Sequence, residues 1–131
     1  MIGLDTNVIV RYVMQDDPAQ SRSASKLIES LSTENRAFLG LVVIVELVWV
    51  LRTSYQTPRQ GIAKVLDALL QTREFTIERA DLVGQALRLY TDGGADFADC
   101  LIARCASASD CDLIFTFDRT ASAATGMRLL S

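Results

Sequence analysis

The sequence contains no histidine, and its 131 residues include only two prolines and three cysteines. Without histidine, an imidazole general base, imidazole coordination of a metal and a Ser-His-Asp triad are all excluded. Cys100, Cys105 and Cys111 are odd in number, and their spacing fits no zinc-binding pattern. Any catalytic chemistry in this chain must therefore rest on carboxylates.

The sequence also lacks a long uninterrupted apolar run. The longest apolar segment, residues 37–51, is shorter than the roughly 20 residues that a membrane helix needs, and it contains Glu46. An apolar strand begins at Met1, which leaves no room for a signal peptide. We therefore expect a cytoplasmic protein that does not enter a membrane.

The net charge of −3 argues against passive binding to a polyanion, although two bound divalent ions would reverse its sign. Half of the residues are hydrophobic, and a chain of this length can bury a proper core. We find no internal repeat, linker or shift in composition. The sequence therefore predicts one domain spanning residues 1–131.

Hydrophobic periodicity alternates between short strand-like runs and longer helical segments. Strands are predicted at residues 1–4, 37–39, 75–77, 113–117 and 127–130, and helices begin near residues 8, 18, 41, 57, 83 and 96. Such alternation is typical of a mainly parallel sheet with helices on both faces. The predicted fold class is therefore α/β, a three-layer α/β/α sandwich.

Two acids stand where predicted buried strands end. Asp5 follows the first strand directly, and Asp118 follows the strand at residues 113–117. Parallel strands end at the same edge of a sheet, which is the usual ligand-binding edge. Each of these acids could instead simply cap the helix that follows it, because aspartate is a favoured N-cap residue.

Glu46 lies within the apolar helix predicted at residues 41–54. A buried carboxylate without a partner is costly. Glu46 therefore either points to a rim, where Arg52 or solvent relieves it, or faces a pocket that holds a cation.

Asp96 and Asp99 fall near the start of another helix, where they could cap it or interact with its dipole, or could hold a cation. Asp99 borders the predicted buried stripe and Asp96 lies further towards solvent. The stripe is expected to comprise Ala98, Leu101, Ile102 and Cys105.

Four carboxylates in one cleft repel one another, and each raises the pKa of the others unless a cation is bound. Oxygen-only ligands select Mg²⁺ or Mn²⁺ over zinc. Such an ion polarises a phosphoryl oxygen and lowers the pKa of an attacking water. The set of acids therefore points to phosphodiester hydrolysis.

Four segments of the sequence resemble the PIN-domain family, and specifically its VapC-like ribonuclease toxins from prokaryotic toxin–antitoxin pairs. The matching segments are residues 4–7 (LDTN), 46–51 (ELVWVL), 95–103 (ADFADCLIA) and 116–119 (TFDR). They occur in the family's order and span essentially the whole chain. The resemblance implies an α/β/α sandwich and RNA cleavage that depends on Mg²⁺ or Mn²⁺.

The resemblance also implies roles for individual residues. The catalytic metal ligands would be Asp5, Glu46, Asp99 and Asp118, with Asp96 as an accessory metal ligand. The residues that orient these carboxylates would be Thr6, Asn7 and Thr116.

The partners implied by the resemblance are an RNA substrate, a second copy of the chain in a homodimer, and a VapB-like antitoxin whose tail occupies a groove beside the cleft. Trp49, with Val48 and Leu51, is a candidate for that groove, although core packing is the alternative for each.

Two departures from the family pattern are visible. Gly40 and Leu41 replace a common capping Ser or Thr, and Cys100 and Arg104 replace commonly small residues.

Two alternatives remain. A haloacid-dehalogenase-like phosphotransferase also uses an acid at a strand end, but it needs a second acid where this chain has Asn7. The non-enzymatic alternative is a catalytically silent PIN-like binding module, against which the retention of all four acids argues.

Overall fold

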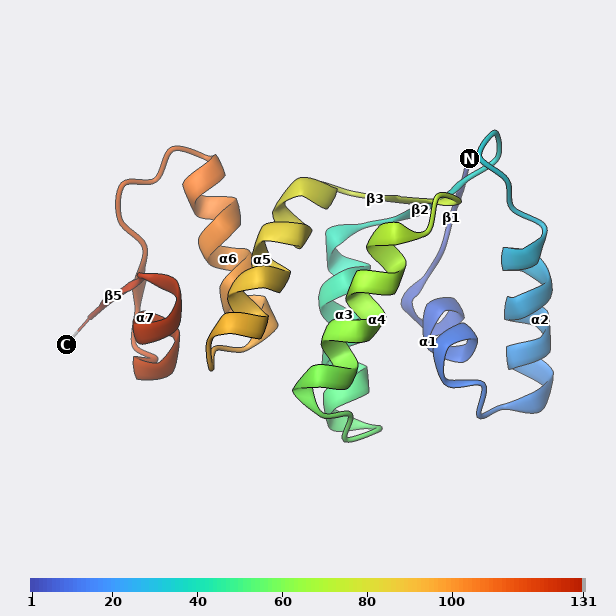
Figure 1. Cartoon of the computed structure of the whole chain (residues 1–131), viewed down its shortest axis with the longest axis horizontal. Coiled ribbons are helices and arrows are strands. Elements are labelled where there is room, and N and C mark those ends of the chain that lie inside the picture. Colours follow the sequence, from blue (N-terminus) through green and yellow to red (C-terminus); the bar gives the residue numbers. More distant parts are fainter. Residues whose placement is uncertain (131) are drawn as a thin grey trace. The chain divides into compact units, whose positions relative to one another are not determined.

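The computed structural model describes residues 1–130 and divides into two compact units, Met1–Glu78 and Arg79–Ser131 (Figure 1). The first unit contains β1 (Ile2–Gly3), α1 (Thr6–Met14), α2 (Pro18–Glu29), β2 (Ala37–Leu39), α3 (Leu41–Thr53), α4 (Arg59–Gln71) and β3 (Phe75–Ile77). The second contains α5 (Ala80–Asp92), α6 (Phe97–Ala108), β4 (Phe115–Thr116), α7 (Arg119–Thr125) and β5 (Arg128–Leu129).

The sheet of the first unit has the order β1-β2-β3, and both strand pairs are parallel. Two helices separate each strand from the next, as crossover connections between parallel strands require. The strands at residues 37–39 and 75–77 begin and end where the sequence predicts. Leu4, which follows β1, is buried, and the exposed Asp5 comes directly after it.

Helix α3 supplies much of the core of this unit. Ile44, Leu47 and Leu51 of α3 have no exposed surface. Their spacing of three and four residues places them on one face of the helix. The opposite side carries exposed side chains, among them Val42, Glu46 and Trp49. The predicted helix at residues 41–54 is therefore one-sided, although its sequence is apolar almost throughout.

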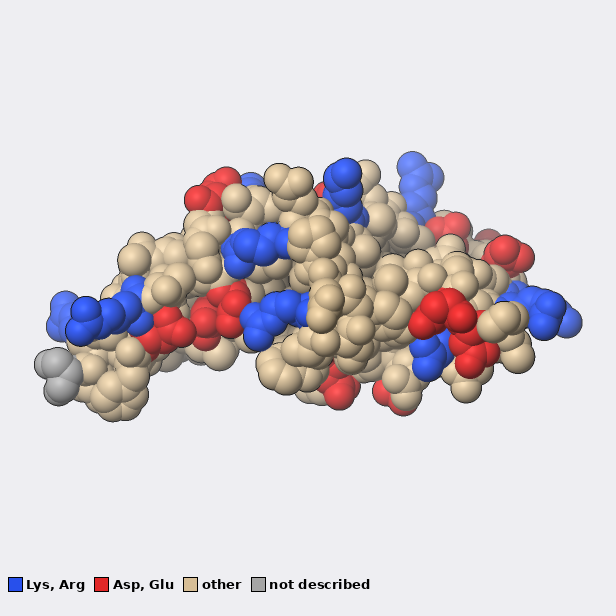
Figure 2. All heavy atoms as spheres, turned by 90° about the horizontal axis from the view of Figure 1, so that it is seen from below, with Lys and Arg blue, Asp and Glu red and all other residues tan. Residues whose placement is uncertain are grey.

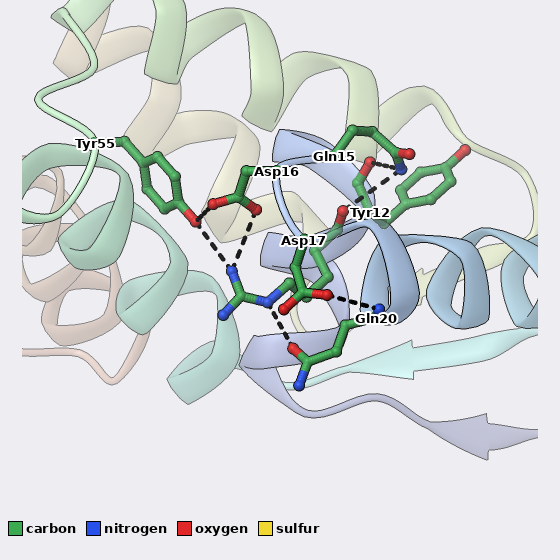
Figure 3. A network of polar contacts seen from close by, with 7 residues as sticks. Tyr12, Gln15, Asp16, Asp17, Gln20 and Tyr55 are labelled. Atoms are coloured by element: carbon green, nitrogen blue, oxygen red, sulfur yellow. Dashed lines mark hydrogen bonds and ion pairs between the residues drawn. The ribbon is translucent and has the colours of Figure 1, made fainter.

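A polar network ties the end of α1 to the start of α2 and to the segment after α3 (Figure 3). The Arg11 guanidinium donates to Asp16, to Gln20 and to the hydroxyl of Tyr55, and that hydroxyl donates to Asp16 at 2.6 Å. The hydrogen bond from Tyr55 is the largest influence that lowers the pKa of Asp16. These contacts fix the helix that begins at the end of β1.

In the second unit, α5 and α6 pack side by side (Figure 1). The rings of Tyr90 and Phe97 meet edge to face, with 5.9 Å between their centroids. Phe97 is the first residue of α6, directly after Asp96, and only 1% of it is exposed. This aromatic contact anchors the turn of α6 that carries both predicted acids.

The predicted buried stripe of α6 is wrong in part. The buried residues are Phe97, Cys100, Leu101 and Ala103, whereas Ile102 is 54% exposed and Ala98 and Cys105 are half-buried. Because Phe97 packs against α5, the helix turns a different set of side chains inward. Cys100, which lay outside the predicted stripe, has no exposed surface.

The predicted buried strand at residues 113–117 is also shorter and more exposed than expected. Only Phe115 and Thr116 form β4, which pairs in parallel with β5, and Phe117 is 77% exposed. A strand with a single neighbour in a two-stranded ribbon covers little of its own surface.

The alternation of helices with parallel strands confirms the predicted α/β class. Within residues 1–130, none of the helices is both long enough and apolar enough to cross a membrane.

Candidate metal-binding acidic site

In the first unit, Thr6 makes hydrogen bonds with both Asp5 and Glu46. The Asp5 carboxylate accepts a hydrogen bond from the backbone N–H of Thr6 at 2.7 Å, so Asp5 caps α1. The Thr6 hydroxyl donates to Oε1 of Glu46 at 2.9 Å across 40 residues of sequence. Thr6 is buried, so this contact holds the otherwise exposed Glu46 carboxylate in one orientation. The Thr6 hydroxyl therefore orients the Glu46 carboxylate, and a role for Thr6 at a metal site stays a prediction.

The sequence left open whether Glu46 points to a solvent-exposed rim or faces a pocket that holds a cation. Its carboxylate is exposed rather than buried, and its hydrogen bond comes from Thr6. The Arg52 guanidinium instead lies over the ring of Trp49, 5.5 Å from the ring centroid. Trp49 is 60% exposed, so it belongs to the surface of α3 and not to the core.

The start of α3 has an unusual cap. Gly40 is the N-cap residue and has no side chain to offer, as its departure from the family pattern suggested. The Glu78 carboxylate, which follows β3, accepts the N–H of Leu41 at 2.8 Å. Glu78 was not predicted, because nothing in the sequence links two positions that are 37 residues apart. It stabilises the end of the helix on which Glu46 lies.

In the second unit, three of the predicted acids line one cavity of about 240 Å³. These are Asp96, Asp99 and Asp118, and the cavity is completed by Gly94, Ala95 and Thr120. Asp96 and Asp99 come from the start of α6, and Asp118 from the start of α7. Acids about 20 positions apart in the sequence thus line the same cavity.

The electrostatics of this cavity are those of carboxylates that repel one another. Burial raises the pKa of Asp99, and the nearby charges of Asp96 and Asp118 raise it further. Asp99 is half-buried while the other two acids are exposed. A positive charge in the cavity would relieve both effects, because it favours the ionised form of each carboxylate.

Asp118 is held by two hydrogen bonds at the start of α7. Its carboxylate accepts from the backbone N–H of Ala121 at 2.9 Å, and its own N–H donates to the hydroxyl of Thr116 at 3.0 Å. Thr116 therefore contacts the backbone of Asp118, and its role in orienting the carboxylate stays a prediction. Asp118 and Asp5 both act as helix caps, and each leaves one carboxylate oxygen outside the capping bond.

The donor chemistry fits a hard divalent cation, since every acid supplies oxygen and no imidazole is present. Within residues 1–130, however, no three acidic or cysteine side chains stand close enough together to form a metal site. Asp96, Asp99 and Asp118 share a cavity without converging on one point. The meeting of these acids with Asp5 and Glu46 stays a prediction.

Asn7, which was predicted to orient a metal-binding carboxylate, lines a different cavity from the acidic one. Asn7 is exposed and lines a cavity of about 580 Å³ between α1 and α2, together with Val8, Arg11 and Leu27. Its predicted role in orienting a carboxylate gains no support from this position. Gly94 and Thr120, which complete the acidic cavity, were not predicted, because neither carries a charged group that marks it in the sequence.

Acidic and basic side chains lie intermingled on the face drawn in Figure 2. The net charge of −3 alone argues against binding of an anionic ligand, whereas a surface that also carries Lys and Arg side chains is compatible with it.

Residues 2–126 match the model of the PIN domain family, and the match runs through both compact units. The chain is 28% identical over 99 residues to the VapC ribonuclease of Aquifex aeolicus (strain VF5). That alignment covers 75% of this chain and 73% of the relative.

Proposed function

Because the chain belongs to the PIN-domain family, we propose that it is an endoribonuclease that hydrolyses RNA phosphodiester bonds with the help of Mg²⁺ or Mn²⁺. We assign Asp5, Glu46, Asp99 and Asp118 as its catalytic acids and metal ligands, and Asp96 as an accessory ligand. The family also supports the three-layer α/β/α fold. The haloacid-dehalogenase alternative is set aside by the family match.

The observation that carries the proposal is the cavity lined by Asp96, Asp99 and Asp118, where burial and then the two neighbouring acids raise the pKa of Asp99. A carboxylate whose ionised form is disfavoured by its surroundings suits a site that is completed by a cation. The similarity to a VapC ribonuclease supports RNA as the substrate class.

When bound, a divalent ion would polarise a phosphoryl oxygen and lower the pKa of an attacking water. The chain's own groups would prepare the site for it. Thr6 donates to Glu46 and holds that carboxylate in place, and Thr116 and the first turn of α7 fix Asp118. Removing a group that orients a metal-binding carboxylate commonly lowers metal affinity or activity about 10- to 100-fold.

The proposal extends to the biological role. We infer that residues 1–131 work as one domain, as the toxin of a VapBC-type pair, in the cytoplasm where its RNA substrate occurs. Its partners would be a VapB-like antitoxin and a second copy of the chain. The similarity to a VapC ribonuclease over three quarters of the chain supports this role.

The test is RNA cleavage by the purified wild-type chain, followed on gels with total RNA or a tRNA and rRNA mixture. We expect discrete fragments with Mg²⁺ or Mn²⁺ and none with excess EDTA. Co-purified antitoxin should suppress the fragments. A catalytically silent binding module would instead retain RNA without cutting it under any metal condition, and that result would refute the enzymatic role.

A further inference from the structure

A second cavity adjoins the acidic one in the unit Arg79–Ser131. It has a volume of about 380 Å³ and is lined by Leu89, Asp92, Gly93, Gly94, Thr120, Ala123 and Ala124. Gly94 and Thr120 line both cavities, so the two are neighbours with a shared wall. Whatever binds at the acids can therefore extend into the second cavity.

Two helices build this second cavity in a regular way. The end of α5 contributes Leu89, Asp92 and the C-cap residue Gly93, and α7 contributes Thr120, Ala123 and Ala124. Each set is spaced by three and four residues. This spacing puts each set on one helical face. The volume lies within the range of about 300–1,000 Å³ that is typical of pockets for small organic groups.

Four of the residues that line this cavity are small, namely Gly93, Gly94, Ala123 and Ala124. A Cβ atom added to Gly93 would lie 3.1 Å from the Cβ of Ala124, and one added to Gly94 would lie 3.7 Å from a methyl carbon of Thr120. The first distance is tighter than an ordinary contact. The Gly93-Gly94 pair and the two alanines thus keep open a space that larger residues would fill.

Asp92 is the one charged residue among those that line this cavity. Its side chain is exposed and, within residues 1–130, it makes no hydrogen bond or ion pair. A carboxylate repels a phosphate but accepts hydrogen bonds from N–H groups. The cavity therefore suits a flat, uncharged group that presents adjacent N–H donors, with apolar contacts from Leu89, Ala123 and Ala124.

Among the parts of RNA, guanine fits this description best. Its Watson–Crick edge presents two neighbouring N–H donors that one carboxylate can accept together, whereas the other bases offer a single donor site on that edge. Proteins read single-stranded RNA by such contacts to splayed-out bases. We propose that this cavity holds a guanine next to the scissile phosphate, with Asp92 as the residue that selects it; this inference rests on the proposed ribonuclease function.

The experiment is cleavage of a randomised single-stranded RNA pool by the whole chain, with sequencing of the new ends. For the wild type we expect guanine to be enriched about tenfold at one position beside the cut, as one carboxylate–base pair can supply. D92N should reduce this enrichment towards the pool average while cleavage continues. A123L, an exposed position of α7 that lines the cavity, should do the same by filling it.

Two matched variants serve as controls. D112N changes an exposed aspartate of the same unit, and A68L an exposed helical alanine, and neither residue lines the acidic cavity or the second one. Both should keep the wild-type base distribution. Enrichment that is absent in the wild type, or unchanged in D92N and A123L, would overturn the inference alone. A wild type that cuts no RNA would overturn the ribonuclease function together with it.

Discussion

Replacing Asp99 with asparagine should abolish RNA cleavage and at the same time stabilise the metal-free protein. The loss of activity is expected to be about 100-fold or more, since a direct ligand matters at least as much as the groups that orient it. The gain in stability has a separate cause. The folded-state pKa of Asp99 is raised, first by burial and then by Asp96 and Asp118, so its charge at neutral pH destabilises the fold.

The pH dependence of this effect follows from its sign. A carboxyl whose folded-state pKa is raised costs stability above that pKa, and the cost disappears below the unfolded-state value of about 3.9. In EDTA, the melting temperature of D99N should therefore exceed that of the wild type at pH 7. The two should become equal as the pH falls below about 4.

Asp81 provides a matched control with the opposite sign. It also lies in the first turn of a helix, α5, but its hydrogen bonds with Arg79 lower its pKa. Its charge contributes stability above the unfolded-state pKa, and this contribution is lost as the pH falls through the folded-state value. D81N should therefore lower the melting temperature at pH 7 and leave cleavage intact. Equal shifts in D81N and D99N would contradict the assignment.

Replacing Asp5 with asparagine should also reduce cleavage by about 100-fold or more, with little change in stability. Asparagine caps a helix about as well as aspartate, so the cap on α1 is retained while the charge is lost. This substitution therefore separates a catalytic role from the capping role that the structure shows. The measurement is the initial rate of RNA cleavage, with a thermal melt to verify folding.

Asp17 is the matched control for Asp5, because its carboxylate caps α2 by accepting the N–H of Gln20 in the same unit. D17N makes the same chemical change at a comparable position. We expect D17N to cleave RNA at the wild-type rate. A fully active D5N, or equal losses in D5N and D17N, would show that Asp5 acts only as a cap.

The sequence predicts the strands well where the chain itself marks their ends. The strand at residues 37–39 ends at Gly40, and the strand at 75–77 stands between two long helical patterns. The buried face of α6 was harder to predict from the sequence. Ile102 and Ala103 are neighbours and both are apolar, so hydrophobicity does not show which of them points inward. The contact between Tyr90 and Phe97 decides between them, and it depends on tertiary packing.

The site shows the same division. The sequence marks Asp99 and Asp118 as acids near the starts of two helices, and the structure shows that both line one cavity. The sequence could not predict that Glu78 caps α3, or that Gly93 and Gly94 line a cavity. Both features depend on which segments of the chain approach one another. Local patterns thus locate charges, whereas the shape of a cavity follows from packing.

The central claim is that the carboxylates of this chain hold a divalent ion, and calorimetric titration of Mg²⁺ into the purified wild-type chain at neutral pH tests it most directly. The claim predicts saturable binding that raises the melting temperature, as expected of a ligand that binds only the folded state. Binding should be lost in D99N and retained in D81N. No binding to the wild type, or equal binding to D99N, would contradict the claim.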